Sequence, residues 1–182
     1  MLILYAILIL CLLLASIYDV RIKKIPNWLS LALMVSGLIG NYFAIKGLSL
    51  GDSSGGIITG LLLMLPGYVF GSMGAGDVKL MAAIGSVVGF TQIVDVVIYS
   101  YLLMFVLAVL FVIIKGDLIR LLRRYQMLLY GLFSGIASYQ KPDSSEAAGQ
   151  RVPLAPTIAL ATCYVLYPKI CNLGFMVTLC RF

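Results

Sequence analysis

Gly74-Ala75-Gly76-Asp77 is a glycine-flanked carboxylate that separates two strongly apolar segments of the chain. Placing a charge at the edge of hydrocarbon is costly, so an acidic residue in this position indicates a functional site. Asp19 is the one other acidic residue in a comparable position, directly after an apolar segment. We therefore interpret Asp19 and Asp77 as a pair that the rest of the chain brings together.

The composition is that of a membrane protein. Of the 182 residues, 62% are apolar and 11% are charged, whereas a soluble domain has about half and about a quarter. The length suits a single membrane-embedded domain over residues 1–182, without a separate soluble domain. A net charge of +6 is also typical of nucleic-acid binding, but the positive-inside rule explains it better, and we expect no nucleic acid partner.

The apolar segments predict an all-α integral membrane protein with about six transmembrane helices. Pro66 predicts a kink in the third helix, and Gly71–Gly76 predicts a glycine-rich turn before Asp77. Asn27, which follows Pro26, is a candidate N-cap of the second helix. The apolar stretch Cys171–Phe182 is too short to span again. The predicted spans are Leu2–Tyr18, Trp28–Ile45, Gly56–Phe70, Val78–Phe90, Ile93–Ile114 and Pro153–Tyr167.

Residues 115–151 predict a different kind of segment. Between Asp117 and Leu129, charged residues and leucines have the spacing of an amphipathic helix that lies in the membrane surface. The polar stretch Ser138–Gln150 is typical of a flexible loop. We therefore expect a cytoplasmic amphipathic helix and loop before the last span.

The basic residues predict the orientation in the cytoplasmic (inner) membrane. If the loop that follows Asp19 is cytoplasmic, the positive charges concentrate on that side, as the positive-inside rule requires. Both termini then lie outside, and Asp19 and Asp77 lie at the same cytoplasmic depth. Of the 13 lysines and arginines, the cytoplasmic side holds all except Lys46, Lys169 and Arg181.

Several kinds of catalysis are excluded or disfavoured. The chain has no histidine, which excludes Ser-His and Cys-His catalysis. Its four cysteines form no C-x-x-C pair, so we expect no zinc or other metal and no cofactor. The N-terminus lacks a basic start and a small-residue cleavage site, so we expect a retained first span.

Two carboxylates at one membrane edge can act as an aspartyl dyad. Like charges about 3 Å apart cannot both ionise, so the pair shares one proton. The ionised member takes a proton from water, and the protonated member hydrogen-bonds the scissile carbonyl and later protonates the leaving amine. The residue types do not determine which aspartate is the base and which is the acid. Gly74 and Gly76 permit backbone angles that other residues avoid, or let an extended substrate come close.

The motifs around this pair resemble those of a known family. Asp19 with Ile25-Pro26-Asn27, and Gly74-Ala75-Gly76-Asp77-Val78-Lys79-Leu80, are similar to the two signatures of type IV prepilin peptidases, which are GxGD membrane aspartyl proteases. Val152-Pro153-Leu154-Ala155-Pro156 is similar to a proline-bearing segment at the family's last conserved helix. The resemblance implies that Asp19 and Asp77 are the catalytic pair. Gly74, Gly76, Lys79, Pro26 and Asn27 are the residues expected to shape the site or bind substrate.

The resemblance also implies a substrate. The family removes the short basic leader of prepilin and pseudopilin precursors at the cytoplasmic membrane face. Larger members carry a domain with paired C-x-x-C motifs that N-methylates the product. This chain looks like the short TadV/CpaA-like members that serve tight-adherence (Flp) pili, so cleavage without methylation is expected.

Two other classes of function remain open at this point. A proton- or cation-coupled transport subunit also carries paired membrane acids, although these usually lie near the midplane. A non-catalytic subunit of a pilus or secretion assembly is the third class, and it should tolerate Asn at both positions. The oligomeric state and any gating of the site by the 138–150 loop are not apparent from the residues.

Overall fold

The structure is a computed structural model that describes residues 2–43, 48–69, 71, 73–114 and 154–179. These residues form helices and no strands. Two compact units are distinguished, the first comprising Met1–Leu103 with Pro153–Phe182 and the second Met104–Val152. The helices are α1 (Leu2–Ile22), α2 (Asn27–Phe43), α3 (Leu50–Val69), α4 (Ala75–Val88), α5 (Phe90–Ile114) and α7 (Ala155–Leu179).

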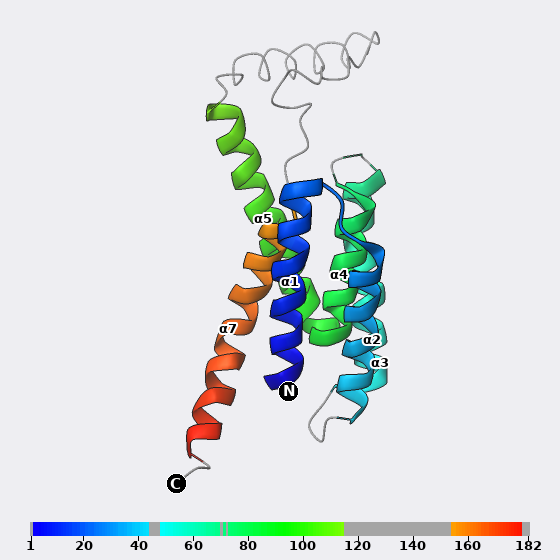
Figure 1. Cartoon of the computed structure of the whole chain (residues 1–182), viewed down its shortest axis with the longest axis vertical. Coiled ribbons are helices and arrows are strands. Elements are labelled where there is room, and N and C mark those ends of the chain that lie inside the picture. The colour runs from blue at the N-terminus through cyan, green and yellow to red at the C-terminus, as the bar shows by residue number, and fades with distance from the viewer. Residues whose placement is uncertain (1, 44–47, 70, 72, 115–153, 180–182) are drawn as a thin grey trace. The chain divides into compact units, whose positions relative to one another are not determined.

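Within the first unit, successive helices run in alternating directions (Figure 1). The end of α1 therefore lies toward the same end of this unit as the starts of α2, α4 and α7. This arrangement brings together segments that are more than 50 residues apart in the chain. It places Asp19 and Asp77 toward the same end of this unit, while their membrane depth stays a prediction.

Helix α4 packs closely against α2 and α3. Its contact with α3 depends on two glycines, because a Cβ atom on Gly56 would collide with the carbonyl oxygen of Gly85. At the end of α2, Asn41 is 2% exposed, and its Nδ2 donates to Ser53 Oγ at 3.1 Å and to the carbonyl oxygen of Ser86 at 3.0 Å. Buried polar groups require such partners. These hydrogen bonds therefore hold α2, α3 and α4 together at the end of α4 that is opposite to Asp77.

Helix α1 packs mainly against α7. Leu8, Leu12 and Ala15 of α1 are buried, as are Ile158 and Ala161 of α7. Small residues such as alanine allow helices to approach closely in an apolar environment. The α1–α7 pair therefore forms a second packing layer beside α2, α3 and α4.

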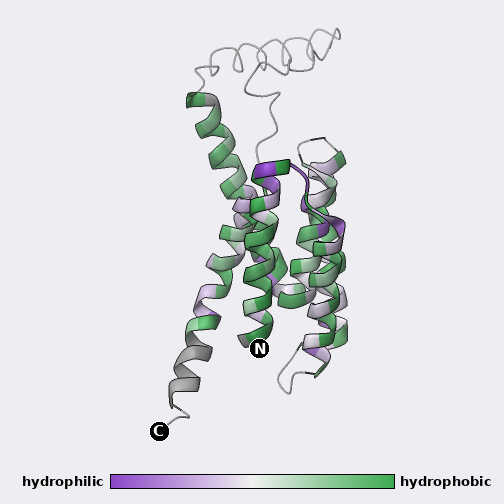
Figure 2. Cartoon of the chain, viewed as in Figure 1, coloured by the Kyte–Doolittle hydropathy of each residue, from purple (hydrophilic) through white to green (hydrophobic). Residues whose placement is uncertain are grey.

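The outer surface of the described helices is largely hydrophobic, and polar residues concentrate where α1 joins α2 (Figure 2). Two described helices contain segments long and apolar enough to cross a membrane, Ile3–Ile22 and Phe90–Phe111. Large apolar side chains are exposed on all the described helices except α4, for example Ile3, Phe43 and Phe105. Such extensive apolar exposure is typical of a membrane-embedded surface rather than of a water-soluble one.

Several predicted boundaries are wrong. Helix α1 does not end before Asp19 but continues to Ile22, and Lys23 ends it with a φ of 54°. Helix α3 begins at Leu50, six residues before the predicted start, because Ser49 and Asp52 form a reciprocal cap. Both this cap and the early start could have been recognised from the Ser-x-x-Asp spacing.

The last helix also differs from its prediction. Helix α7 does not end near Tyr167 but continues through Pro168 to Leu179, so most of Cys171–Phe182 belongs to it. Pro66 lies inside α3, and the kink predicted there stays a prediction. The predicted amphipathic helix and loop of residues 115–151 lie outside the described residues.

Candidate active site

Asp77 is held by the beginning of its own helix. It lies in the first turn of α4, where Gly74 N–H donates to Asp77 Oδ2 at 3.1 Å and Asp77 N–H donates to the carbonyl oxygen of Gly74, also at 3.1 Å. An acidic residue at this position satisfies free N–H groups and interacts favourably with the helix dipole. Asp77 is 7% exposed, and no described residue hydrogen-bonds its Oδ1.

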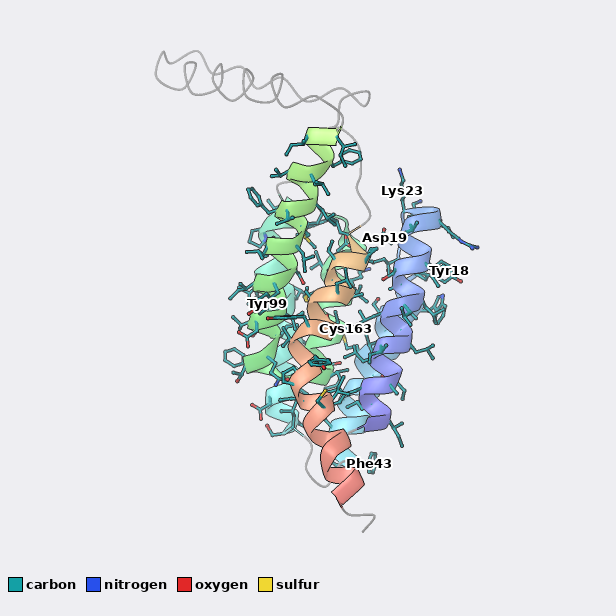
Figure 3. All side chains as sticks on the ribbon, turned by 90° about the vertical axis from the view of Figure 1, so that its left-hand side faces the viewer. Tyr18, Asp19, Lys23, Phe43, Tyr99 and Cys163 are labelled. Atoms are coloured by element: carbon teal, nitrogen blue, oxygen red, sulfur yellow. The ribbon has the colours of Figure 1, made fainter. Side chains whose placement is uncertain are left out.

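Asp19 is held by a different helix. It lies in the last turn of α1 and is 8% exposed, and its Oδ2 accepts a hydrogen bond of 2.9 Å from the backbone N–H of Ala155 at the start of α7. Figure 3 shows Asp19 where α1 adjoins the beginning of α7, while Lys23 extends beyond the end of α1. Asp19 thus connects two helices whose sequences are 136 residues apart.

The environment of Asp77 raises the pKa of its carboxyl group. Burial raises the pKa of the Asp77 carboxyl to about 6, the Gly74 N–H opposes this rise, and the charge of Asp19 contributes to it. Asp77 lies outside both segments that are long and apolar enough to cross a membrane. The charge of Asp19 thus favours the protonated form of Asp77, in addition to the larger effect of burial.

The Ile25-Pro26-Asn27 segment lies against the start of α4. A Cβ atom on Gly76 would lie 3.1 Å from Ile25 Cβ, so the α1–α2 connection passes close to the backbone of α4. Two residues beyond Asp77, Lys79 Nζ donates to Asn27 Oδ1 at 3.0 Å. The two sequence motifs are therefore in direct contact, through Ile25 against Gly76 and through Asn27 bonded to Lys79.

Three expectations about these residues need correction. Gly74 has a φ of −82° and Gly76 is helical, so neither has a backbone conformation reserved for glycine. Among the described glycines, Gly71 and Gly89 have positive φ. Asn27 does not cap α2, because it is the first helical residue and its side chain accepts from Lys79.

Ala155 is the group near the carboxylates that sequence reasoning did not single out. Its contribution is a backbone N–H, which no residue type reveals. The segment Pro153-Leu154-Ala155-Pro156 could have indicated this donor. Prolines are common in the first turn of a helix, where the backbone N–H groups have no partner within the helix. Pro26 makes a backbone contact, accepting the N–H of Leu29 at 3.2 Å.

The described residues contain no cluster of three or more His, Cys, Asp or Glu side chains that could hold a metal ion. The arrangement consists of two buried carboxylates, each with one oxygen bonded to a backbone N–H. Two carboxylates that share a single proton can serve as an acid and a base. An acid and a base of this kind can activate a water molecule for attack on a carbonyl.

Comparison with known proteins identifies the family of this chain. No curated protein and no solved structure matches the chain. A sequence model of the type IV leader peptidase family matches residues 6–109, more than half of the 182 residues. The matched region contains Asp19, the Ile25-Pro26-Asn27 segment and Asp77. The chain therefore belongs to the type IV leader peptidase family, whose members are hydrolases that cleave peptide bonds.

Proposed function

We propose that this protein is an aspartic endopeptidase that removes the leader from prepilin-like precursors at the cytoplasmic face of the membrane. Asp19 and Asp77 are the catalytic pair in this proposal. One observation carries it: both carboxylates are buried at the same end of the first unit, where the charge of one raises the pKa of the other. The membership in the leader peptidase family supports the substrate class.

The proposed reaction uses one shared proton. The ionised carboxylate accepts a proton from water, whose oxygen attacks the scissile carbonyl, and the protonated carboxyl donates a hydrogen bond to the carbonyl oxygen. Gly74, Gly76, Lys79, Pro26 and Asn27 shape the site in this proposal. The contact of Ile25 with Gly76 and of Asn27 with Lys79 supports that role.

The remaining parts of the proposal concern orientation and product. An inner-membrane orientation with about six spans and both termini outside follows from the positive-inside rule. The 182 residues contain no C-x-x-C pair, so the proposed product is not N-methylated by this chain. The proposed substrates are the precursors of tight-adherence (Flp) pilins and related pseudopilins.

Co-expression with a cognate prepilin, read by the intact mass of the pilin, tests this function. The wild-type enzyme should remove the leader without adding the mass of a methyl group. Asp19→Asn and Asp77→Asn should each abolish cleavage, because a dyad needs both a base and an acid. Asp95→Asn is the matched control, since Asp95 is exposed on α5 and should retain activity.

The same experiment separates the alternatives. If both variants reach the membrane and still cleave, the aspartyl mechanism is wrong. If the wild-type enzyme leaves a cognate prepilin intact, the transport and assembly functions become the better interpretations. Those functions would be measured by ion flux and by pilus assembly in the Asn variants.

A further inference from the structure

We propose that the backbone N–H of Ala155 holds Asp19 as the ionised member of the pair, so that Asp19 is the base and Asp77 the acid. This assignment rests on the proposed function. It begins from the 2.9 Å hydrogen bond between Ala155 N–H and Asp19 Oδ2. A hydrogen bond donated to a carboxylate favours its charged form.

The first turn of α7 directs one donor at Asp19. The first N–H groups of a helix have no partner within the helix. In α7, however, Pro156 has no N–H. The N–H groups of Thr157 and Ile158 both donate to the carbonyl oxygen of Leu154, at 3.1 and 3.2 Å. The N–H of Ala155 is therefore the free donor at this end, and it is used by Asp19.

Asp19 supplies the N-terminal cap that the sequence of α7 itself lacks. Leu154 precedes α7 and has no polar side chain that can accept from the first turn. Asp19 supplies the oxygen from α1 instead, and it meets the positive end of a 25-residue helix. Ala155 has no exposed surface, and a hydrogen bond to a charge is stronger in such an environment than in water.

The surroundings of Asp77 favour the opposite protonation state. Its Oδ2 accepts a part-buried hydrogen bond from the N–H of Gly74, which is an exposed residue, whereas Ala155 has no exposed surface. The Oδ1 of Asp77 is buried, and none of the described residues hydrogen-bonds it. A proton on Oδ1 is therefore free to be donated to a substrate, while the bond from Gly74 to Oδ2 stays in place.

Other charged groups do not reverse this assignment. On the elements that pack against the end of α1, α2 carries no charged residue, and α7 carries only Lys169, 14 residues beyond its start and thus about 21 Å away. On α4, Lys79 is exposed and bonded to Asn27. Arg21 and Lys23, near the end of α1 itself, are exposed to solvent.

The assignment gives a balanced reaction. Water oxygen bonds to the carbonyl carbon while one water proton passes to Asp19, which leaves an oxyanion hydrogen-bonded to protonated Asp77. The carbon–nitrogen bond then breaks, the amine takes the proton of Asp77, and the carbonyl re-forms as the new carboxylic acid. Transfer of the proton from Asp19 to Asp77 restores the starting state.

The direct test replaces the peptide bond before residue 155 by an ester, with L-lactate at position 155 of the full chain. This removes the N–H and little else. We expect kcat to fall about ten- to hundredfold, the range for losing a hydrogen bond to a charged group, with KM nearly unchanged. The acidic limb of the kcat/KM profile should move to higher pH. Asp95→Asn, on the exposed side of α5 and outside the site, should retain both values.

A second measurement tests the division of roles without altering α7. Infrared spectra of 13C-aspartate-labelled enzyme at pH 5 should show a protonated carboxyl band that Asp77→Asn removes and Asp19→Asn retains. The reverse pattern would overturn the assignment. So would an ester variant with wild-type kcat and an unshifted acidic limb. These outcomes concern only the division of roles between Asp19 and Asp77. If Asp19→Asn does not cleave, the proposed peptidase function stands; if Asp19→Asn still cleaves, that function is refuted.

Discussion

Lys79 Nζ lies 3.0 Å from Asn27 Oδ1 and donates a hydrogen bond to it. This bond joins the first residue of α2 to the helix that carries Asp77. The pair is exposed, so its direct contribution to stability is small. Its effect is to keep the α1–α2 connection against the start of α4, next to both carboxylates.

Removing this bond should impair positioning more than chemistry. We expect Lys79→Met and Asn27→Ala each to lower kcat by about three- to tenfold, since small displacements of a catalytic group slow the reaction. The double variant should be no worse than either single one, because both remove the same interaction. Kinetics of leader cleavage measure this. A Lys79→Met variant as inactive as Asp77→Asn would instead indicate a direct catalytic role for Lys79.

Gly76 and Gly74 should both be sensitive to size, Gly76 the more so. Gly76→Val would push Ile25 away and should lower activity by at least about tenfold. Gly74→Ala requires no unusual backbone angle, because φ is −82°, but its Cβ would lie 3.3 Å from Asp77 Oδ2, so we expect a loss of activity of about three- to tenfold. Cleavage assays and circular dichroism of both variants measure this. If Gly74→Ala is inactive yet helical, the glycine is needed for close approach of the substrate backbone.

Two adjacent glycines in α3 should respond differently to alanine. Gly56→Ala places a methyl group against the carbonyl oxygen of Gly85 and should lower the free energy of unfolding by about 1–3 kcal/mol. Gly55→Ala meets the Phe90 side chain at ordinary contact distance, 3.6 Å from its Cβ, and should be neutral or stabilising by up to about 1 kcal/mol. Thermal unfolding of detergent-purified protein compares them. Equal loss in both variants would contradict the tight α3–α4 contact.

Activity should depend on the proton of Asp77. Burial raises the pKa of this carboxyl to about 6, so raising the pH through 6 removes the proton and leaves two ionised carboxylates without an acid. We expect kcat/KM, which reports the free enzyme, to fall above pH about 6 and also at low pH, where both groups are protonated. Leader cleavage measured across this range, with Trp28 fluorescence as a control for folding, tests this. A profile that stays flat into the alkaline range would contradict it.

The sequence was sufficient to find the carboxylates but not their partners. Alternating helix directions place Asp19 and Asp77 at one end, and this follows from counting apolar segments and basic loops. The two motifs were also recognisable, although their contact through Ile25 and Gly76 was not. Side-chain contacts between distant segments depend on helix rotation and spacing, which residue types alone do not determine.

Helix ends were predicted less well for identifiable reasons. The positive φ of Lys23 is unusual for a non-glycine residue and gives no signal in the sequence. Pro168 lies within α7 although proline generally interrupts helices, and this is tolerated more often in apolar surroundings. Ala155 was missed because its functional group is part of the backbone. A search for carboxylates opposite proline-rich helix starts would have found it.

The bonds made by Asn41 have a mechanical consequence for the site. They tie α2 and α3 to the end of α4, the helix that carries Asp77. Asp19 instead bonds α1 to the start of α7. The two carboxylates thus belong to two different groups of helices. In the proposed mechanism, a displacement of one group along the other would separate Asp19 from Asp77 and abolish cleavage, while every hydrogen bond within each group stayed intact.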